Sequence, residues 1–384
     1  MRVKLKDAFN LQMGKTPSRA DLSMWGGNNK WISIADIGSA KKYISSTKEC
    51  ITDEGVSRSG IKVVPEGTVI MSFKLSIGKT AIVSEDMYTN EAIMAFIDNG
   101  TYCIDPNYLY HLCCGTDWTQ GGNKAVMGLT LNKATLSEME IELPTIEEQR
   151  EIASKLDQLD AIIEKRHDEL NMIEQLVKSR FIELIHNNNI RYVKLKDVAE
   201  DGRIITYGIV KPGEHTEGGV PIIKVKDFPN GTILMSDMLL ASPEIESKYE
   251  RSRVKEGDLL FSIRGSVGRT AFVPKELIDA NITQDTARIS VGTDFNPHYI
   301  RAALGFDSVQ QEINEHVRGV AVRGISLAEL RDIGIPIVEK KTQDEFGRFV
   351  EQTDKSKFFA CQTLSFLLKL ANNLQSWREK QYDY

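Results

Sequence analysis

The sequence contains an internal repeat, and this repeat limits the possible folds more than any other feature. Residues 3–7 recur as residues 193–197, and residues 67–81 match residues 257–271 at the same offset of 190. Later matches keep their order while the offset rises by only four residues. An ordered series of matches at a nearly constant spacing indicates duplication, so we expect two similar structural units in one chain.

Each half of the sequence has the same internal plan. A region of short β-branched and aromatic runs, interrupted by Gly, Pro and Asn, comes first and is typical of many short strands. Each region ends at a proline, Pro144 or Pro336, after which a long helix is predicted. The expected units are a domain at 1–146, a helix with its linker at 147–189, a second domain at 190–339 and a second helix at 340–384.

Apolar residues recur at alternating spacings of four and three along both predicted helices. The first seam consists of Ile152, Leu156, Leu159, Ile163, Arg166, Leu170, Ile173, Val177, Arg180 and Leu184, and the second of Phe346, Val350, Thr353, Lys357, Ala360, Leu364, Leu367, Ala371, Leu374 and Arg378. Eight of ten positions in the first seam and seven of ten in the second are apolar, which indicates a coiled coil. The polar members either extend their charged ends out of the seam, fix its register or meet a partner.

The repeat and the seams together predict an α+β fold. We expect two mixed α/β domains, related by a pseudo-two-fold axis and held apart by two long helices that form an antiparallel coiled coil. The first helix is expected to begin with a capping box made by Thr145 and Glu148. Two similar domains on one chain suit two short sites on one DNA duplex.

Charge restricts where nucleic acid could bind. The formal net charge is −6, with 15 basic and 16 acidic side chains in residues 1–146 and 19 and 22 in residues 187–339. A DNA-binding surface must therefore be a local patch. The acidic balance leaves open an alternative, a coiled-coil adaptor that binds only protein.

Composition also bears on location and on cofactors. Hydrophobic residues make up 41% of the chain, and no apolar run approaches the ~18 residues of a membrane span. The five cysteines lack metal-ligand spacing, and the start lacks a signal peptide. These features predict a cytoplasmic protein with reduced thiols, no membrane contact, no metal site and no cofactor of its own.

Three motifs resemble catalytic sequences but lack essential members. Residues 78–80 look like the end of a P-loop, but Phe73 stands where that motif needs glycine. Residues 105–108 lack the second proline of the amino-methyltransferase tetrapeptide, and residues 246–248 lack the preceding Pro-Asp of a nuclease site. A fused methyltransferase or nuclease therefore fails as a hypothesis, and the chain is predicted not to be an enzyme.

Candidate DNA contacts come from cations, amides and aromatic residues in segments rich in small residues. Lys and Arg suit phosphates, whereas Arg, Asn and Gln suit base edges. An ordinary hairpin with solvated cations would give the same sequence around 74–79 and 264–269, and Trp31 and Tyr207 could equally be core residues. The full candidate set is Lys15, Arg19, Lys30, Trp31, Lys74, Lys79, Asn123, Lys124, Tyr207, Lys224, Lys226, Arg264, Arg269, Arg318 and Arg323.

Several segments resemble the specificity subunits of type I restriction–modification systems. Residues 143–152 are similar to the family's Leu/Ile-Pro-x-x-x-Glu-Gln-x-x-Ile signature. Residues 14–19, followed by residues 25–27, resemble the Gly-x-Thr-Pro opening of a target recognition domain. Residues 257–260 with 265–268 match the pattern Gly-Asp-Leu-Leu…Gly-Ser-x-Gly, from which the first repeat departs. The resemblance covers essentially the whole chain.

The resemblance implies two target recognition domains, each of which reads one half of a bipartite sequence in double-stranded DNA. It implies that the helices set the gap between the halves and dock two methyltransferase subunits, which carry S-adenosylmethionine, with restriction subunits as further partners. The partner-binding residues implied are Glu148, Gln149, Ile152 and Gln343. In the second repeat the signature is reduced to Pro336 and Gln343, so the two helices are not expected to bind partners identically.

Overall fold

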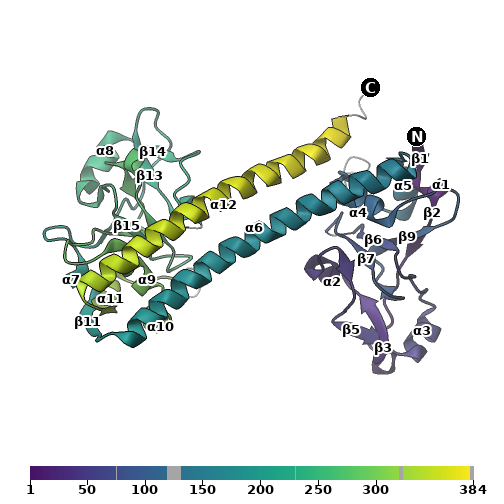
Figure 1. Ribbon diagram of the computed structural model, residues 1–384, viewed down its shortest axis with the longest axis horizontal. Coiled ribbons are helices and arrows are strands. Elements are labelled where there is room, and N and C mark those ends of the chain that lie inside the picture. The colour runs from purple at the N-terminus through teal and green to yellow at the C-terminus, as the bar shows by residue number, and fades with distance from the viewer. Residues whose placement is uncertain (75, 119–130, 230, 320–322, 381–384) are drawn as a thin grey trace. The chain divides into compact units, whose positions relative to one another are not determined.

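A computed structural model describes residues 1–384 apart from 75, 119–130, 230, 320–322 and 381–384, and it leaves the side chains of 372–380 undescribed. The chain forms two compact units, Met1–Arg166 with Thr363–Tyr384 and His167–Gln362. Each unit contains one domain of mixed α/β structure and parts of the two long helices, α6 (Ile146–Asn187) and α12 (Lys340–Lys380) (Figure 1). In the part of the chain that the structure describes, no helix has the length and hydropathy needed to cross a bilayer.

Domain 1 precedes α6 and consists of short elements, as the sequence predicts. In chain order these are β1 (Arg2–Lys4), α1 (Leu5–Ala8), β2 (Phe9–Met13), η1 (Leu22–Met24), β3 (Trp25–Ile32), α2 (Ile34–Ser39), β4 (Tyr43–Ile44), β5 (Glu49–Ile51), α3 (Asp53–Ser59), β6 (Val69–Ser72), β7 (Thr80–Val83), β8 (Tyr88–Thr89), β9 (Ile93–Asp98), α4 (Pro106–Gly115), α5 (Lys133–Glu138) and β10 (Glu140–Glu142).

Domain 2 lies between α6 and α12 in the chain and has a closely similar order of elements. These are β11 (Arg191–Lys194), α7 (Leu195–Val198), β12 (Thr206–Tyr207), β13 (Val220–Ile223), η2 (Val225–Asp227), β14 (Leu239–Ala241), α8 (Pro243–Glu246), η3 (Ser247–Ser252), β15 (Leu259–Ser262), β16 (Thr270–Phe272), η4 (Lys275–Leu277), β17 (Asn281–Ile282), β18 (Thr286–Ile289), α9 (Pro297–Leu304), α10 (Asp307–His316), α11 (Leu327–Asp332) and β19 (Gly334–Ile337).

The sheets of the two domains share a topology, except that among the described residues the larger sheet of domain 2 has no strand equivalent to β4. The larger sheet has the order β2-β9-β6-β7-β4 in domain 1 and β12-β18-β15-β16 in domain 2. The smaller sheet has the order β5-β3-β8 in domain 1 and β14-β13-β17 in domain 2, and in both its middle strand pairs antiparallel with one neighbour and parallel with the other. The repeat seen in the sequence is therefore a repeat of structure.

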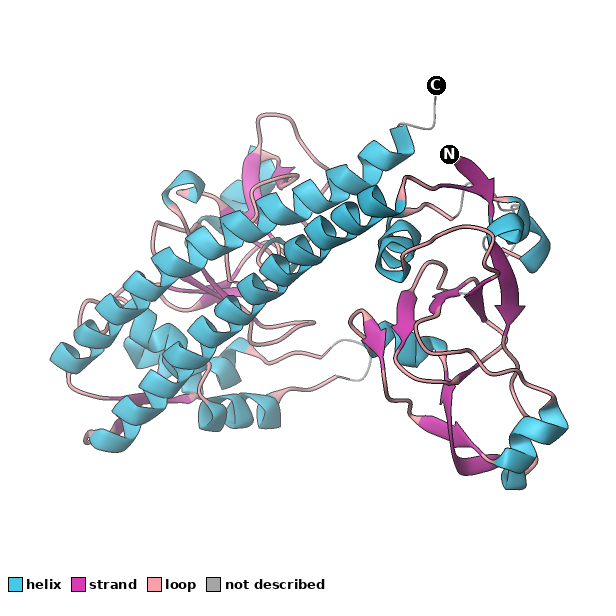
Figure 2. Ribbon diagram, turned by 45° about the vertical axis from the view of Figure 1, so that its right-hand side comes forward, coloured by secondary structure: helices cyan, strands magenta, loops and turns pink. Residues whose placement is uncertain are grey.

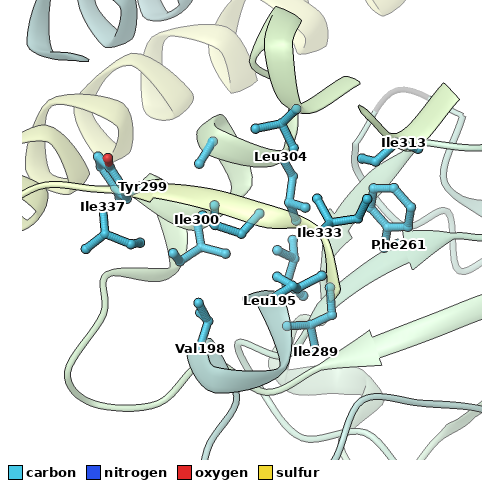
Figure 3. Close-up of a cluster of buried hydrophobic side chains, with 14 of the residues drawn as sticks. Leu195, Val198, Phe261, Ile289, Tyr299, Ile300, Leu304, Ile313, Ile333 and Ile337 are labelled. Carbon is cyan, nitrogen blue, oxygen red and sulfur yellow. The ribbon is translucent and has the colours of Figure 1, made fainter. Parts of the chain in front are cut away.

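Each domain is closed by a strand pair that joins its start to its end. The strand β1 pairs antiparallel with β10, and β11 pairs antiparallel with β19, so each domain returns to its first strand just before its long helix begins. The central strands β6 and β15 are buried along their whole length, as their continuous apolar sequences require. Figure 3 shows part of the core of domain 2, in which Leu195, Phe261 and Tyr299 come from different elements.

The start of α6 confirms the predicted capping box. The Glu148 carboxylate accepts hydrogen bonds from the backbone N–H (2.9 Å) and the hydroxyl (3.1 Å) of Thr145, while the Thr145 hydroxyl accepts from the Glu148 backbone N–H at 3.3 Å. Each hydrogen bond satisfies a group that the first turn of a helix leaves without an internal partner.

The antiparallel pairing of the long helices is visible within the second unit, where both are continuous helices (Figures 1 and 2). The rings of Phe181 and Phe346 lie 5.5 Å apart, and Glu174, seven residues earlier on α6, forms a 2.5 Å ion pair with Lys357, eleven residues later on α12. Pairs that move in opposite directions along the two helices require antiparallel chains. Lys357, a polar member of the predicted seam, therefore forms an ion pair with the neighbouring helix, and this pair helps to fix the register of the two helices.

One position of the first predicted seam is wrong. Arg180 is exposed and pairs with Glu183, while the adjacent Phe181 is only 2% exposed. The Phe181 ring also packs against Tyr299 and Phe306 of domain 2. Phe181 is buried in place of Arg180 because the end of α6 packs onto the core of domain 2 as well as onto α12.

Candidate nucleic-acid interface

In domain 2, four loops meet at one edge of the sheets, which we call edge 2. They are 207–212 after β12, 224–227 after β13, 263–269 after β15 and 283–285 between β17 and β18. The last of these is the centre of edge 2, because its backbone is bonded to the other three loops or to the strands that lead into them. Edge 2 therefore gathers side chains that are distant in sequence onto one rigid frame.

Four backbone hydrogen bonds fix the centre of edge 2. The N–H of Thr283 donates to the carbonyl of Ile223 at 3.3 Å, and the N–H of Gln284 donates to that of Ile209 at 3.0 Å. The N–H of Gly208 donates to the carbonyl of Thr283 at 3.2 Å, and the N–H of Ile263 donates to that of Asp285 at 2.8 Å. Loop conformations tied in this way place their side chains more reproducibly than a free loop does.

A further loop brings two more arginines to edge 2. The N–H of Gly265 donates to the carbonyl of Arg323 at 2.9 Å, and Arg318 and Gly324 exchange two 2.8 Å backbone hydrogen bonds. The loop that carries Arg264 is thus joined to the segment that carries Arg318 and Arg323. Both segments are predicted from the sequence to contact DNA, and the structure shows that they are neighbours.

A serine hydroxyl bridges the two sides of the loop between β15 and β16, and a serine in domain 1 makes the same two hydrogen bonds. The Ser262 hydroxyl donates to the carbonyl of Ser266 at 2.5 Å and accepts from the N–H of Arg269 at 2.8 Å. In domain 1 the Ser72 hydroxyl makes the same two bonds, to the carbonyl of Ser76 and from the N–H of Lys79. The segment at 78–80 is therefore part of a turn between strands, as predicted.

The four arginines of edge 2 lie at the surface, and one of them, Arg318, donates a hydrogen bond to the backbone carbonyl of Glu315. Arg264, Arg269, Arg318 and Arg323 are all exposed, and within the described chain none of them forms an ion pair with a carboxylate. Lys226 is exposed and Lys224 half-buried, and both line a hollow of about 360 Å³ at edge 2. These cations form a local basic patch on a chain whose net charge is negative.

Domain 1 forms an equivalent edge, edge 1, from residues 13–17 at the end of β2 and after it, 33–36 at the start of α2, the described residues of 73–79 after β6, and 90–92 before β9. The N–H of Asn90 donates to the carbonyl of Ile32 at 3.0 Å, and the N–H of Phe73 donates to that of Ala92 at 3.0 Å. These bonds match the bonds of Thr283 and Ile263 in edge 2. Glu91 in edge 1 therefore occupies the place of Gln284 in edge 2.

A glycine allows two chain segments to cross closely at each edge. A Cβ atom at Gly14 would lie 2.0 Å from the carbonyl oxygen of Thr89, and a Cβ atom at Gly208 would lie 1.9 Å from that of Ile282. Neither approach leaves room for a side chain. The glycine of the Gly-x-Thr-Pro segment is thus required by the packing of main chain on main chain, and Gly208 is its counterpart in domain 2.

The cations near edge 1 are largely engaged with carboxylates. Arg19 forms a bidentate pair with Glu49, with the second contact at 2.9 Å, and its guanidinium lies 3.8 Å from the centre of the Trp25 ring. Hydrogen bonding to Arg19 lowers the pKa of Glu49. Lys30 pairs with Glu85 and also donates to the carbonyl of Ser45 at 2.7 Å.

Among the residues that the structure describes, the other lysines of edge 1 form no ion pair with a carboxylate. Lys15 donates to the carbonyl of Ser59 at 3.3 Å, and Lys79 is exposed beside Gly38. Lys74 is half-buried, with its ammonium 5.2 Å from the centre of the Phe73 ring. Edge 1 therefore presents fewer cations without carboxylate partners than edge 2.

Two aromatic candidates behave differently. Trp31 is 2% exposed and its indole N–H donates to the carbonyl of Lys15 at 2.9 Å, so the suggestion that it contacts DNA is wrong. It is a core residue of the small sheet of domain 1. Tyr207 is 43% exposed at edge 2 and stays a candidate. Asn123 and Lys124 lie outside the described residues.

The residues suggested for partner binding are mostly internal. Gln149 is 1% exposed, and its side chain accepts from the N–H of Asp105 at 2.9 Å and donates to the carbonyls of Cys103 and Pro144. Gln343 is also 1% exposed, accepts from the N–H of Asn296 at 3.1 Å and donates to the carbonyl of Val338 at 2.8 Å.

The partner-binding interpretation is therefore wrong for both glutamines. Each glutamine ties the first turn of a long helix to the loop before α4 or α9, because a buried amide must find internal partners. Ile152 packs partly buried against the core of domain 1, and Glu148 is used in the helix cap. The second repeat keeps the glutamine tie although the rest of the signature has changed.

The motifs that resembled catalytic sequences have structural roles. Asp105 caps α4 with Pro106 in its first turn, as expected of a turn that opens a helix. The Glu246 carboxylate is 1% exposed and is bonded to Arg253 at 2.6 and 2.7 Å and to the Asn281 amide at 3.0 Å. Both carboxylates are occupied by these contacts.

Sequence reasoning missed Gln284 and Asp285. Neither lies in a basic or Gly-rich run, and only the strand pairing brings them to the centre of edge 2. One signal in the sequence could have found them, which is their position in the repeat. Residues 90–92 come just before the buried strand β9, and residues 283–285 come just before its counterpart, the buried strand β18.

The fold defines a duplicated protein in which each domain has an edge that carries exposed cations. Comparison with known proteins agrees with this class. The family model described as type I restriction modification DNA specificity domain matches residues 1–175 and 187–359. The chain belongs to this family, whose members are the non-catalytic specificity subunits of type I restriction–modification systems.

Individual relatives are similar over nearly the whole chain. The EcoBI specificity subunit of Escherichia coli is 26% identical over 92% of this chain and 78% of its own length. The MjaIX specificity subunit of Methanocaldococcus jannaschii is 29% identical over 91% of this chain and 85% of its own length. The solved S subunit from M. genitalium is 14% identical, with a TM-score of 0.58 over 98% of this chain and 94% of that one, which shows a shared fold.

Proposed function

We propose that the chain recognises a bipartite sequence in double-stranded DNA, with edge 1 reading one half-site and edge 2 reading the other. The observation that carries the proposal is edge 2, where four exposed arginines without carboxylate partners meet on a rigid frame. Arginine forms bidentate contacts with guanine and with phosphate, so such a cluster suits the major groove of DNA. Edge 1 repeats the frame with different side chains, which predicts a different half-site.

The chain would act within a complex. We propose that methyltransferase subunits, which would carry S-adenosylmethionine, dock on the long helices and that restriction subunits can join them. Two equivalent hollows support the docking surface. One, of about 370 Å³, lies between α4 and α6 and includes Asn107 and Asp157. The other, of about 500 Å³, includes His298 and Glu351, which are their counterparts in the second repeat.

Exposed aromatic residues mark the second hollow as a contact surface. Phe358 is 58% exposed and Phe359 is 67% exposed, both on α12 beside this hollow. Large exposed apolar groups that lie together on a helix are typical of a protein interface. Changing both to Ser should abolish association with the methyltransferase in a pull-down, whereas Leu22→Ser, which removes an exposed apolar residue of domain 1, should not. Unchanged association of the double variant would contradict this docking site.

The test of the proposed function is co-expression with a cognate methyltransferase, followed by mapping of methylated bases in the host DNA. The proposal predicts one bipartite motif with two specified halves separated by an unspecified spacer. If the purified complex binds random and native duplexes equally at physiological salt, the proposal is wrong and the adaptor interpretation stands.

A further inference from the structure

Gln284 lies at the centre of edge 2, where its backbone is fixed. Its backbone and those of its two neighbours make the four hydrogen bonds that join the loops of the edge. Its side-chain amide has no hydrogen-bond partner among the residues that the structure describes, although the residue is partly buried. An amide held in place yet unpaired is suited to a ligand, because its donor and its acceptor are both available.

The surroundings of Gln284 indicate what that ligand is. It shares the hollow of about 360 Å³ with Lys224 and Lys226 on one side. On the other side, Asp285 is bonded through its backbone to Ile263, the residue before Arg264. Long flexible cations on both sides can reach the two phosphate backbones, which leaves the rigid centre of the edge facing the groove between them.

Edge 1 has a carboxylate at the same place. Glu91 is exposed and accepts a hydrogen bond from the Thr16 hydroxyl, which lowers the pKa of Glu91 and keeps it ionised near neutrality. Lys74 and Arg19 add to this effect. An ionised carboxylate only accepts hydrogen bonds, whereas an amide both donates and accepts.

We propose that Gln284 and Glu91 are equivalent base-reading residues, with Gln284 selecting adenine in one half-site and Glu91 selecting cytosine in the other. A glutamine amide matches the N6 donor and N7 acceptor of adenine, and a carboxylate matches the N4 donor of cytosine. This inference rests on the proposed function, because it assumes that each edge reads DNA.

The test uses the full chain with its methyltransferase and a duplex library randomised over the target. Gln284→Glu should change the selected base at one position of one half-site from adenine to cytosine, and Gln284→Ala should relax that position alone by about 10- to 100-fold. Glu91→Gln should make the reverse change in the other half-site. Gln311→Glu, the same charge change at an exposed residue of α10 in domain 2, is the matched control and should leave both half-sites unaltered.

Each outcome decides the inference. The half-site that a variant does not touch reports that the protein is folded and assembled. If the wild-type complex selects a bipartite motif and both Gln284 variants select the same motif, the inference is overturned while the proposed function stands. A uniform loss of affinity over all library sequences would assign Gln284 to the DNA backbone and would also overturn it. If the wild-type complex selects no motif, the proposed function itself fails.

Discussion

Edge 1 and edge 2 have similar backbones but differ in how their charged side chains are paired. Both have a glycine where two chain segments cross, a loop bridged by a serine hydroxyl and two matching backbone hydrogen bonds between strands and loops. In edge 2 the arginines lack carboxylate partners, whereas Arg19 and Lys30 near edge 1 are already paired with acids. The difference shows that a similar backbone frame positions the loops of both edges, while the side chains at the same few places differ in charge.

The largest expected effect comes from the arginines of edge 2. Replacing Arg264 and Arg269 by Ala should weaken binding of the cognate duplex by at least about 100-fold, because each can form a bidentate contact with a base. Lys74→Ala with Lys79→Ala should cost less and should mainly reduce the salt slope by about 2, as expected for phosphate contacts. Titrations with duplexes altered in one half-site measure the affinity and the salt slope of each double variant. Equal losses of affinity in the two double variants would contradict the proposed difference between the edges.

A buried ion pair is present beneath the sheet of domain 2 and has no counterpart at the same position of domain 1. Asp258 is 1% exposed and is bonded to Arg203 at 2.9 Å and to the Ser290 hydroxyl at 2.5 Å, while the repeat places Thr68 there. Asp258→Ala removes the acceptor for the Arg203 guanidinium, the Ser290 hydroxyl and the Lys255 backbone N–H, and it should lower the free energy of unfolding by about 2 kcal/mol. Thr68→Ala should cost less than about 1 kcal/mol. Urea unfolding measures the difference, which should vanish if the network is not stabilising.

A smaller effect should follow from releasing a cation near edge 1. Glu49→Gln removes the acidic partner of Arg19 and leaves its guanidinium for phosphate, so affinity for DNA should rise by roughly 3-fold at low salt. The matched change Glu54→Gln, at the exposed partner of Arg58 in domain 1, should have less effect if Arg58 lies away from the DNA. Weaker binding by Glu49→Gln would show that the ion pair positions Arg19 for its contact.

The smallest expected effect is a pH dependence that both units share. Burial lowers the pKa of His111 against the partial opposition of Asp157 and Asp160, and burial likewise lowers the pKa of His298 beside Asp354 and Glu351. The unfolded chain therefore binds these protons more readily, so stability is lost as pH falls below the ordinary value near 6.5. His111→Gln should lessen the loss between pH 7 and 5, and an unchanged slope in unfolding experiments would contradict this.

Much of the architecture could be predicted because it repeats or is periodic. The nearly constant offset between matching segments predicts the two domains, and the apolar spacings of four and three along each helix predict the seams. The seam failed at Arg180, where the core of domain 2 takes Phe181 instead, a tertiary contact that periodicity does not contain.

The candidate site was less accessible to sequence reasoning. Basic loops could be found by their charge, but Gln284 becomes significant only through the strand pairing that centres it. Gln149 and Gln343 resemble surface residues of a helix start, and only their burial reveals that they tie the helix to its domain. A tryptophan in a polar segment resembles a base-stacking residue, yet Trp31 lies in the core of its small sheet.

The most direct test of the account uses a photo-crosslinking residue at each edge. Met13 and Tyr207 occupy equivalent strand ends, pairing with Met94 and Ala287, and are 44% and 43% exposed. With a crosslinker at position 13 or 207, the complex with methyltransferase is irradiated on its native duplex and the attached bases are mapped. We expect position 13 to mark one half-site and position 207 to mark the other. Crosslinks from both positions to the same half-site, or from neither to DNA that is fully bound, would contradict the claim that each domain reads its own half.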